Sequence, residues 1–344
     1  MNKLTIINDL HLGVKRQAGT TAASREALEN WTLNMFGHLL GGIRTDLCIL
    51  GDLFDGYNVS KRVEIQTYLL LSQWLATRPQ QRLYLVAGNH DLSRDSRNLS
   101  SFENLCEYLS HHSQQVTRVI GRTAVIAQGV AAVSHMPNQT LFDEQIEALL
   151  QRDDLKFVLL HCNYDNRFAA QADHSLNISA DTAERFSAKG VQLVFAHEHQ
   201  QRDLRNVHVI GNQFPTSIAD CLGNDGKRFA VIEGDELHYE NYLDIGEVYA
   251  EPDWQSDDVP DKAFIRVSGA AAFGQAAEVI QRLTEMRQES SAFVITNAVE
   301  IEDLQTETQD ISLETCDVVR MVGEELPEGL RQRFKEVAEF RKDA

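Results

Sequence analysis

The chain has 344 residues and 43% hydrophobic content, which suffices for a core in two domains, or in one large and one small domain. Its formal net charge of −19 excludes the basic surface expected of a protein that binds nucleic acid unaided. Five scattered cysteines without a Cys-x-x-Cys pair argue against a disulfide framework and a thiolate zinc site. The N-terminus lacks a signal peptide, and no apolar segment reaches the ~18 residues of a membrane span. We therefore expect a soluble, cytoplasmic protein with no membrane contact.

Strand-like and helix-like patterns alternate along about the first 245 residues. In chain order they predict a strand at 4–7, a helix capped by Ser24, a strand at 47–50, a helix over 61–76, a strand at 82–87, a helix over 101–109, strands at 123–127 and 130–134, a helix over 141–151, and strands at 157–160 and 191–196. The later strands 207–210, 229–232 and 238–243 are expected to form a closing antiparallel set. This order predicts an α/β domain over residues 1–250.

The remaining residues have a different character. Residues 251–262 are acidic, contain two prolines and lack periodicity, which indicates a linker. Beyond it we predict a small α+β unit over 263–325 and a C-terminal segment over 326–344. Their expected elements are a strand at 263–267, a helix over 271–287, a strand at 292–296, an acidic loop at 300–315 and a helix over 328–342.

Five short polar segments follow strand-like runs in the first two hundred residues: Asp9-x-His11, Gly51-Asp52-x-x-Asp55, Gly88-Asn89-His90-Asp91, His161 and His197-x-His199. They supply carboxylate, imidazole and amide oxygen, the ligand types that hard and borderline divalent metals prefer. Each segment alone is common, but all five in this order, each at a strand end, rarely coincide. Because loops at the carboxyl ends of strands form the site crevice of α/β folds, the pattern predicts a two-metal phosphoester-cleaving site.

The ligand types suggest a role for each residue. Asp52 is predicted to bridge two metal ions, because Gly51 allows a tight turn just before it. The other predicted ligands are Asp9 and His11 for one ion, Asn89 and His161 for the second, and His197 and His199 shared between them.

The neighbouring polar residues are expected to act beside the ligands. His90 is predicted to donate a proton to the leaving oxygen or to stabilise phosphoryl charge, held in place by Asp91. Asp55 is expected to be a carboxylate that supports a ligand.

The five segments together resemble the signature of the calcineurin-like metallophosphoesterases, although Ala196 stands where that family usually has glycine. Asp9-Leu-His-Leu-Gly13, Gly51-Asp-Leu-Phe-Asp55 and Val209-Ile-Gly-Asn-Gln-Phe-Pro215 more narrowly resemble the SbcD branch of DNA double-strand-break nucleases. The resemblance covers about residues 1–245 by motif and residues 260–344 by layout alone. The compact C-terminal part resembles phage-encoded recombination nuclease subunits.

The resemblance implies a β-sandwich flanked by helices, with residues 263–325 as a capping domain. It implies a nuclease that acts as exonuclease and endonuclease in DNA repair and recombination. The enzyme would use two divalent metal ions, with Mn²⁺ as the expected metal. Its partners would be DNA and an SbcC-like SMC-family ATPase, with a homodimer as an open alternative. A phage-encoded chain would act in the host cytoplasm.

Two other functions remain open. A phosphatase or nucleotide phosphodiesterase with a small substrate would suit the acidic composition, because it needs no basic groove. A catalytically idle scaffold, or an inhibitor of a host nuclease complex, would retain the fold without the chemistry.

An apolar stripe on the predicted C-terminal helix is the candidate surface for partner docking. It consists of Leu330, Phe334, Val337 and Phe340, which recur at helical spacing. Packing on the protein's own core is the alternative use of this stripe.

Overall fold

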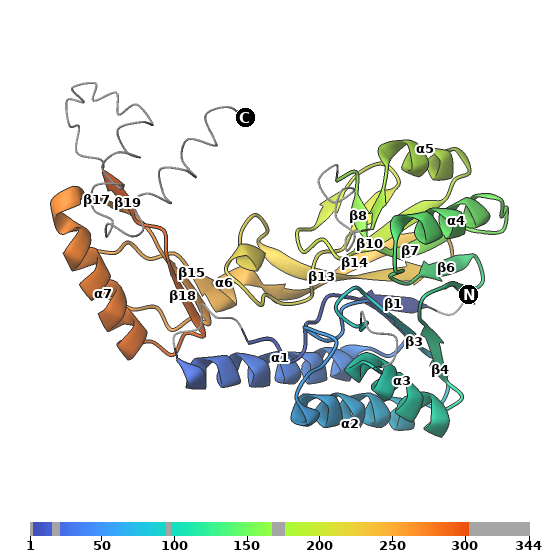
Figure 1. Cartoon of the computed structure of the whole chain (residues 1–344), viewed down its shortest axis with the longest axis horizontal. Coiled ribbons are helices and arrows are strands. Elements are labelled where there is room, and N and C mark those ends of the chain that lie inside the picture. Colours follow the sequence, from blue (N-terminus) through green and yellow to red (C-terminus); the bar gives the residue numbers. More distant parts are fainter. Residues whose placement is uncertain (1–2, 16–20, 94–97, 167–175, 303–344) are drawn as a thin grey trace, which may run out of the picture. The chain divides into compact units, whose positions relative to one another are not determined.

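Two six-stranded mixed β-sheets lie face to face, with helices on both outer faces (Figure 1). The computed structural model describes residues 3–15, 21–93, 98–166 and 176–302. Its architecture confirms the predicted α/β fold, a β-sandwich flanked by helices. Within the described residues, no helix is both long and apolar enough to cross a membrane.

The first sheet has the strand order β14-β13-β1-β2-β3-β4. Strands β1 to β4 are mutually parallel, whereas β13 is antiparallel to both β1 and β14. The parallel arrangement brings the carboxyl ends of β1, β2 and β3 to one edge of the sheet. The strands are β1 (Leu4–Ile7), β2 (Asp46–Leu50), β3 (Leu83–Val86), β4 (Val116–Val119), β13 (Gly226–Glu233) and β14 (Glu236–Asp244).

The second sheet has the order β11-β12-β10-β7-β6-β5. Its central strands β12, β10, β7 and β6 are parallel, and the two edge strands pair antiparallel. The strands are β5 (Thr123–Ala127), β6 (Val130–Val133), β7 (Phe157–His161), β10 (Gln192–Ala196), β11 (Arg202–Asp203) and β12 (Val207–Val209). A separate short pair is formed by β8 (Asn163–Tyr164) and β9 (Asn177–Ile178).

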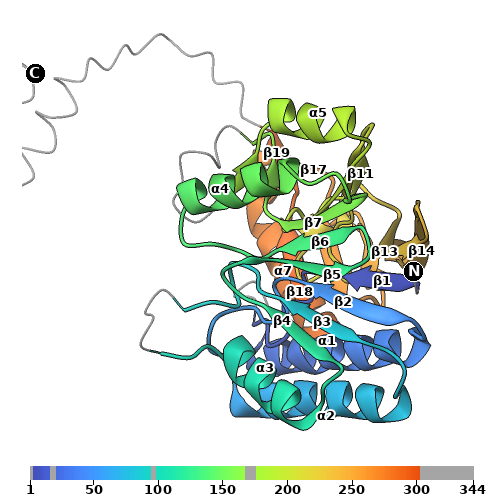
Figure 2. The same ribbon diagram turned by 90° about the vertical axis from the view of Figure 1, so that its right-hand side faces the viewer.

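The central strands are buried on both faces, which explains their nearly continuous apolar sequences. Alternate residues such as Ile6, Cys48 and Leu159 lie in the core between the sheets. Their neighbours pack outward against helices, for example Ile7 beneath α1 to α3 and Leu160 beneath α4 and α5. Figure 2 shows the two helical layers on opposite sides of the sandwich. The helices are α1 (Ala22–Gly42), α2 (Lys61–Thr77), α3 (Ser101–His112), α4 (Gln139–Leu150) and α5 (Ala180–Ala188).

The sequence-based element predictions need four corrections. The helix predicted over 271–287 begins at Ala276, and residues 270–272 form strand β17 instead. The cap of α1 is Thr21, whose side chain accepts from the Ser24 amide, so Ser24 is not the cap. Strand β12 is parallel to β10 in the second sheet, so only β13 and β14 form the expected antiparallel set. Residues 300–302 form strand β19, where a loop was predicted. The remainder of that predicted loop and the helix 328–342 lie outside the described residues.

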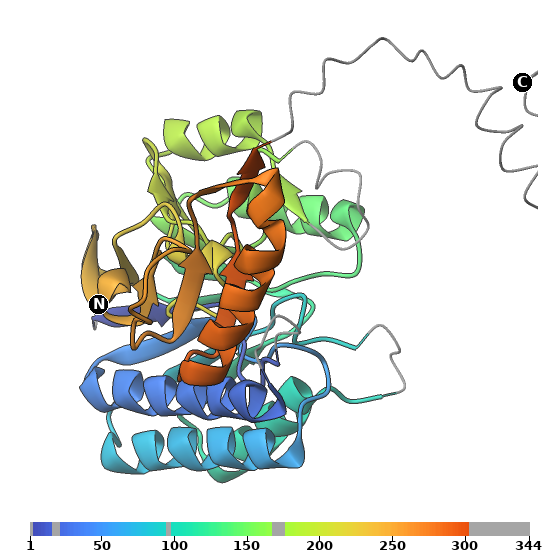
Figure 3. The ribbon, with the colours of Figure 1, turned by 90° about the vertical axis from the view of Figure 1, so that its left-hand side faces the viewer.

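The chain groups into two compact units. The described residues of the first unit are 3–15, 21–93, 98–166, 176–269 and 278–299, and those of the second unit are 270–277 and 300–302. In the first unit a parallel three-stranded sheet follows the sandwich, and Figure 3 shows α7 beside it. Trp31 of α1 contacts the rings of Phe264 and Phe293 with centroid separations of 6.0 and 5.9 Å. The elements of this part of the chain are α6 (Ile245–Val248), β15 (Tyr249–Ala250), β16 (Phe264–Val267), α7 (Ala276–Glu289) and β18 (Val294–Asn297). In the second unit β17 (Ala270–Ala272) pairs with β19 (Glu300–Glu302).

Candidate functional site

The predicted ligands lie where five strands of the two sheets end. Asp9 and His11 follow β1, Asp52 follows β2 and Asn89 follows β3, while His161 ends β7 and His197 and His199 follow β10. Together with His90, several of them form three groups in which one possible ligand atom of each residue lies within 4.8 Å of the others. The groups are Asp9 with His11 and His199, His11 with Asp52 and His90, and Asp52 with His161 and His197. The structure thus brings all seven predicted ligands together, because Asn89 contacts His161 and His197.

Four of these residues have an unusual backbone conformation. Asp9, His11, Asp52 and His197 have φ angles of 47°, 45°, 48° and 78°. The left-handed region is unfavourable for residues other than glycine and is enriched at functional sites. Two hydrogen bonds between the loops help to hold it: Asp9 N donates to Gly51 O at 3.1 Å, and His11 N donates to Asp52 O at 3.0 Å.

The same observation accounts for Ala196. This residue is fully buried at the end of β10 and pairs in register with His161. The left-handed angle falls on His197 instead, so the position before it can carry a methyl group.

Two glycines make room for the ligands. A Cβ atom on Gly51 would lie 2.0 Å from His161 Nδ1, and one on Gly88 would lie 2.2 Å from Asp52 Oδ1. Neither position can accept a side chain without displacing a predicted ligand.

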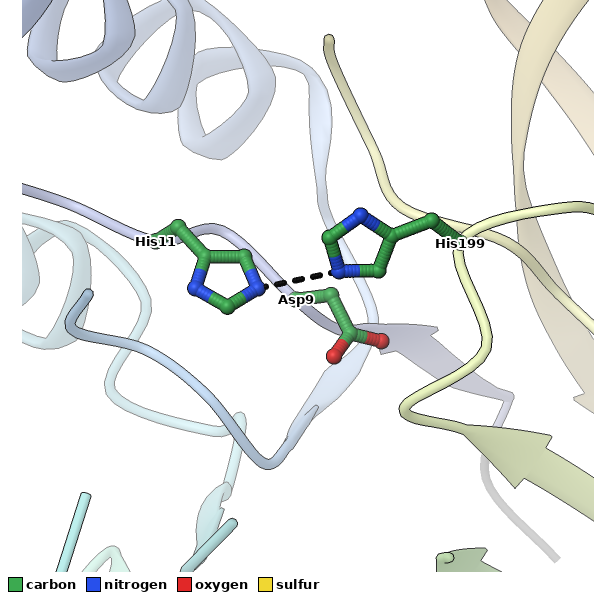
Figure 4. Close-up of side chains that lie close together, drawn as sticks. All are labelled: Asp9, His11 and His199. Atoms are coloured by element: carbon green, nitrogen blue, oxygen red, sulfur yellow. Dashed lines mark hydrogen bonds between the residues drawn. The ribbon is translucent and has the colours of Figure 1, made fainter. Parts of the chain in front are cut away.

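The cluster of Asp9, His11 and His199 is shown in Figure 4. His11 Nε2 lies 3.1 Å from His199 Nε2. The other ring nitrogen, Nδ1, faces a carboxylate in both residues: Asp55 Oδ1 at 3.4 Å from His11, and Asp220 Oδ1 at 2.7 Å from His199. A carboxylate favours the proton on Nδ1, so Nε2 is the nitrogen with the lone pair when such a ring is neutral. Burial opposes protonation of His11, but Asp55, Asp52 and Asp9 outweigh it and raise the pKa of this ring.

Asp9 adds a third acceptor to this cluster. Its Oδ2 accepts from the His197 amide at 2.9 Å and from Asn8 Nδ2 at 2.5 Å. Its Oδ1 is buried and has no hydrogen-bond partner among the described residues. Because buried polar atoms are nearly always satisfied, the orphaned carboxylate oxygen beside two imidazole nitrogens fits a cation at this position.

A second convergence of acceptors involves His161. Its Nδ1 lies 3.1 Å from the Leu50 carbonyl oxygen, which can only accept, so Nδ1 carries the proton. Its Nε2 lies 3.1 Å from Asn89 Oδ1 and 3.3 Å from Asp52 Oδ2, and it offers a lone pair to a cation when the ring is neutral. His197 Nδ1 lies 3.0 Å from the same Asn89 oxygen. This donor set also fits a divalent metal ion.

The electrostatics of the second cluster favour positive charge. Burial opposes protonation of His161, but Asp52 outweighs it and raises the pKa of His161 to about 10. Burial also opposes charge on Asp52, yet His161 and the nearby imidazoles keep the pKa of Asp52 below its ordinary range. Burial, followed by repulsion from His161, lowers the pKa of His197 to about 4, so this ring is neutral.

His90 is exposed, whereas every predicted ligand is buried or partly buried. Its Nδ1 lies 2.8 Å from the backbone oxygen of Asp55, and its backbone amide donates to Asp52 Oδ1 at 2.9 Å. It also lines a depression of about 530 Å³ with Gly56, Tyr57, Asn89, Leu92, Ser93 and Asn98. Nε2 of His90 is therefore the ring nitrogen that a substrate can reach.

Asp91 was expected to hold His90, but its carboxylate contacts backbone amides instead. Its buried carboxylate accepts from the amides of Gly88 at 2.9 Å, Phe54 at 3.1 Å and Leu53 at 3.3 Å. The group that orients His90 is thus the Asp55 carbonyl, while Asp91 ties the loop after β2 to the loop after β3. Burial and the Asp52 charge raise the pKa of Asp91 to about 6.

Two carboxylates support histidines of the first cluster. Asp55 lies against His11 Nδ1, in the supporting position expected for it. Asp220, which contacts His199, was not predicted, because it belongs to no motif and lies 21 residues beyond its partner. The one available sequence signal was its nearness to the segment Val209–Pro215.

The comparisons with known proteins agree with this geometry. The family model for calcineurin-like phosphoesterases matches residues 3–201. The chain belongs to the calcineurin-like phosphoesterase family. It is therefore a metal-dependent phosphoesterase by family, and its clustered histidines and aspartates suit divalent metal binding.

More distant likenesses concern solved structures. One match is the crystal structure of the protein TT1561 from Thermus thermophilus, whose sequence is 12% identical to this chain. The TM-score is 0.42, and the match covers 70% of this chain and 99% of TT1561. A second crystal structure is 10% identical, with a TM-score of 0.38 over 70% of this chain and all of the other. Among curated proteins, none matches the chain significantly.

The close approach at Gly88 generates a prediction. Gly88→Ala should abolish metal binding and phosphodiester hydrolysis, because the new methyl group would overlap Asp52 Oδ1 and its backbone nitrogen. Metal content and hydrolysis of a chromogenic phosphodiester measure this. Gly41→Ala is the matched control, since a Cβ there meets nothing within 4 Å. A Gly88→Ala protein that keeps two metal ions and wild-type rates would show that the loops are not confined as described.

Proposed function

We propose that this phosphoesterase is a two-metal DNA nuclease subunit that hydrolyses phosphodiester bonds in DNA repair and recombination, with Mn²⁺ as its metal. The observation that carries the proposal is the place of Asp52, whose carboxylate groups with His11 of the first cluster and also with His161 and His197 of the second. A carboxylate in that position can serve two ions at once. The SbcD-like segments of the sequence support DNA as the substrate.

The residues divide between two metal positions. Asp9, His11 and His199 would hold one ion; Asn89, His161 and His197 would hold the other; and Asp52 would serve both. When bound, two divalent ions would activate the attacking water and neutralise charge on the phosphoryl oxygens. His90 lies beside these positions in the open depression, where its Nε2 can donate a proton to the leaving oxygen. The exposed Tyr57 in the same depression offers a face on which a base can stack.

Substitutions at Asp52 and His90 should have different effects. Asp52→Ala should abolish hydrolysis and empty at least one metal position, because it removes the shared carboxylate.

His90→Ala should keep both ions, while phosphodiester cleavage falls by about 10²-fold, as for the loss of a general acid. Metal analysis and single-turnover rates on the same preparations measure both effects. Loss of metal from the His90→Ala protein would make His90 a ligand, and an unaltered Asp52→Ala protein would exclude the shared carboxylate.

A phosphoesterase with a small substrate is the second candidate, and the net charge of −19 favours it. End-labelled duplex DNA and mononucleotides, compared in Mn²⁺ with and without an SbcC-like ATPase, separate the two functions. A nuclease should shorten the duplex and leave mononucleotides largely intact. Rapid nucleotide hydrolysis with intact DNA under both conditions would reject the nuclease.

We propose further that an SbcC-like ATPase binds the stripe of Leu330, Phe334, Val337 and Phe340, and that its own DNA contacts compensate for the acidic chain. These four residues lie outside the described structure, so sequence spacing alone supports this role. Deleting residues 327–344 should leave a folded, metal-loaded enzyme that no longer binds the ATPase in a pull-down assay. Glu339→Gln, on the opposite side of the predicted helix, is the control. Continued copurification of the truncated chain would place the docking surface elsewhere, and its unfolding would make the stripe part of the core.

A further inference from the structure

The segment from Gly211 to Cys221 supports the first metal cluster from outside the family-matched region, which ends at residue 201. The amide of Asn212 donates to the His199 carbonyl at 3.3 Å. The carbonyl of Gly211 accepts from Asn8 Nδ2 at 2.8 Å, and the same nitrogen donates to Asp9 Oδ2. Gly211 has a φ angle of 80°, and a Cβ atom there would lie 2.9 Å from the His199 carbonyl oxygen. The segment thus fits closely against two ligand loops.

Asp220 is the residue of this segment that reaches a ligand side chain. It is 3% exposed, and its Oδ1 accepts from His199 Nδ1 at 2.7 Å. Its Oδ2 accepts from the Thr216 and Ser217 amides at 2.9 and 3.0 Å, and from Thr216 Oγ1 at 3.0 Å. Both carboxylate oxygens are therefore fixed, which fixes the plane and the tautomer of His199.

A buried lysine lies behind this carboxylate. Lys227 is 2% exposed, and its Nζ donates to Asn212 Oδ1 at 2.8 Å. A buried ammonium group is costly unless it is compensated. Burial lowers the pKa of Lys227, and the charge of Asp220 opposes that change. Lys227 and Asp220 thus compensate each other's charge beneath the cluster.

Among the described residues, His161 and Asn89 of the second cluster are supported from another part of the chain. His161 is oriented by the Leu50 carbonyl at the end of β2, and Asn89 follows β3. Both supports lie within the first sheet and within the family-matched residues. The two clusters are therefore supported by different parts of the chain.

We propose that Asp220 is a positioning residue for one metal position, because it holds His199 with Nε2 free to bind an ion. Binding of the ion at Asp9, His11 and His199 then depends on the segment 211–221. Binding of the other ion does not. This inference rests on the proposed function, because it requires two metal ions.

The variant Asp220→Asn tests the tautomer directly. The amides of Thr216 and Ser217 would hold the asparagine oxygen in the place of Oδ2. The asparagine NH₂ group would then face His199 Nδ1, which must become an acceptor. The proton of the neutral ring would move to Nε2, the nitrogen that faces the cluster, and would block ligation.

Titration with Mn²⁺, followed by calorimetry and by electron paramagnetic resonance, measures the two positions separately. Wild type should bind two ions and show the signal of a coupled pair. Asp220→Asn should bind one ion with unchanged affinity and the other about 10–100-fold more weakly, and the coupled signal should be lost. Nitrogen NMR of the metal-free protein should show the His199 proton on Nδ1 in wild type and on Nε2 in the variant. The matched control is Asp203→Asn, which alters an aspartate near another histidine, with Oδ1 3.3 Å from His208 Nδ1.

The outcomes separate this inference from the proposed function. Two tightly bound ions in both wild type and Asp220→Asn would overturn the positioning role and leave the nuclease proposal intact. A wild type that does not bind two ions would overturn both. If circular dichroism shows that Asp220→Asn is unfolded, Thr216→Val replaces it, because this change removes a single hydroxyl donor to Asp220. Weakening of one ion by about fivefold or more would support the inference, and unchanged affinities would overturn it.

Discussion

The site depends on one electrostatic constraint, the convergence of imidazole nitrogens and carboxylate oxygens in a small, largely buried space. The Nε2 atoms of His11 and His199 lie 3.1 Å apart, beside the buried Asp9 Oδ1 that has no hydrogen-bond partner among the described residues. Such an arrangement is unfavourable in a buried environment without positive charge. The surrounding chain is built to maintain it, through left-handed backbone angles at four ligands and two glycines that leave no space for a methyl group. Folding energy gained elsewhere in the sandwich holds this costly arrangement in place.

The support for each ligand comes from a different source. His161 is held by a backbone carbonyl of the neighbouring sheet, His11 by the Asp55 carboxylate and His199 by the Asp220 carboxylate. In all three rings the supported nitrogen is Nδ1, which leaves Nε2 as the predicted ligand atom. Asp91 has a related task at the level of the backbone, since it fixes two ligand-bearing loops through three amide groups. A metal centre of this kind relies on the supporting groups as much as on its ligands.

Several elements with a strong local signal were predicted accurately from the sequence. Strands at 4–7 and 123–127 were predicted at their observed bounds, because each is a short run of apolar, strand-forming residues between polar turns. The ligand set could be recognised because every ligand directly ends or follows a strand. The pairing of β12 with β10 could not be predicted, since an apolar run does not specify which sheet it joins. The role of Asp220 and the hydrogen-bond partners of Asp91 were not predicted, for a similar reason. The tertiary fold determines which groups a buried carboxylate contacts, and sequence spacing does not indicate them.

The position of β13 has a consequence for any attempt to dissect the chain. This strand is formed by residues 226–233, beyond the family-matched segment, yet it pairs along β1, which leads into Asp9. A fragment ending at residue 201 would leave β1 as the outermost strand of its sheet, with buried side chains such as Leu4 and Ile6 along an open row of amide and carbonyl groups. Long apolar edges of this kind recruit other strands and promote aggregation. The minimal soluble catalytic unit must therefore extend through the β13–β14 hairpin, well past the last predicted metal ligand.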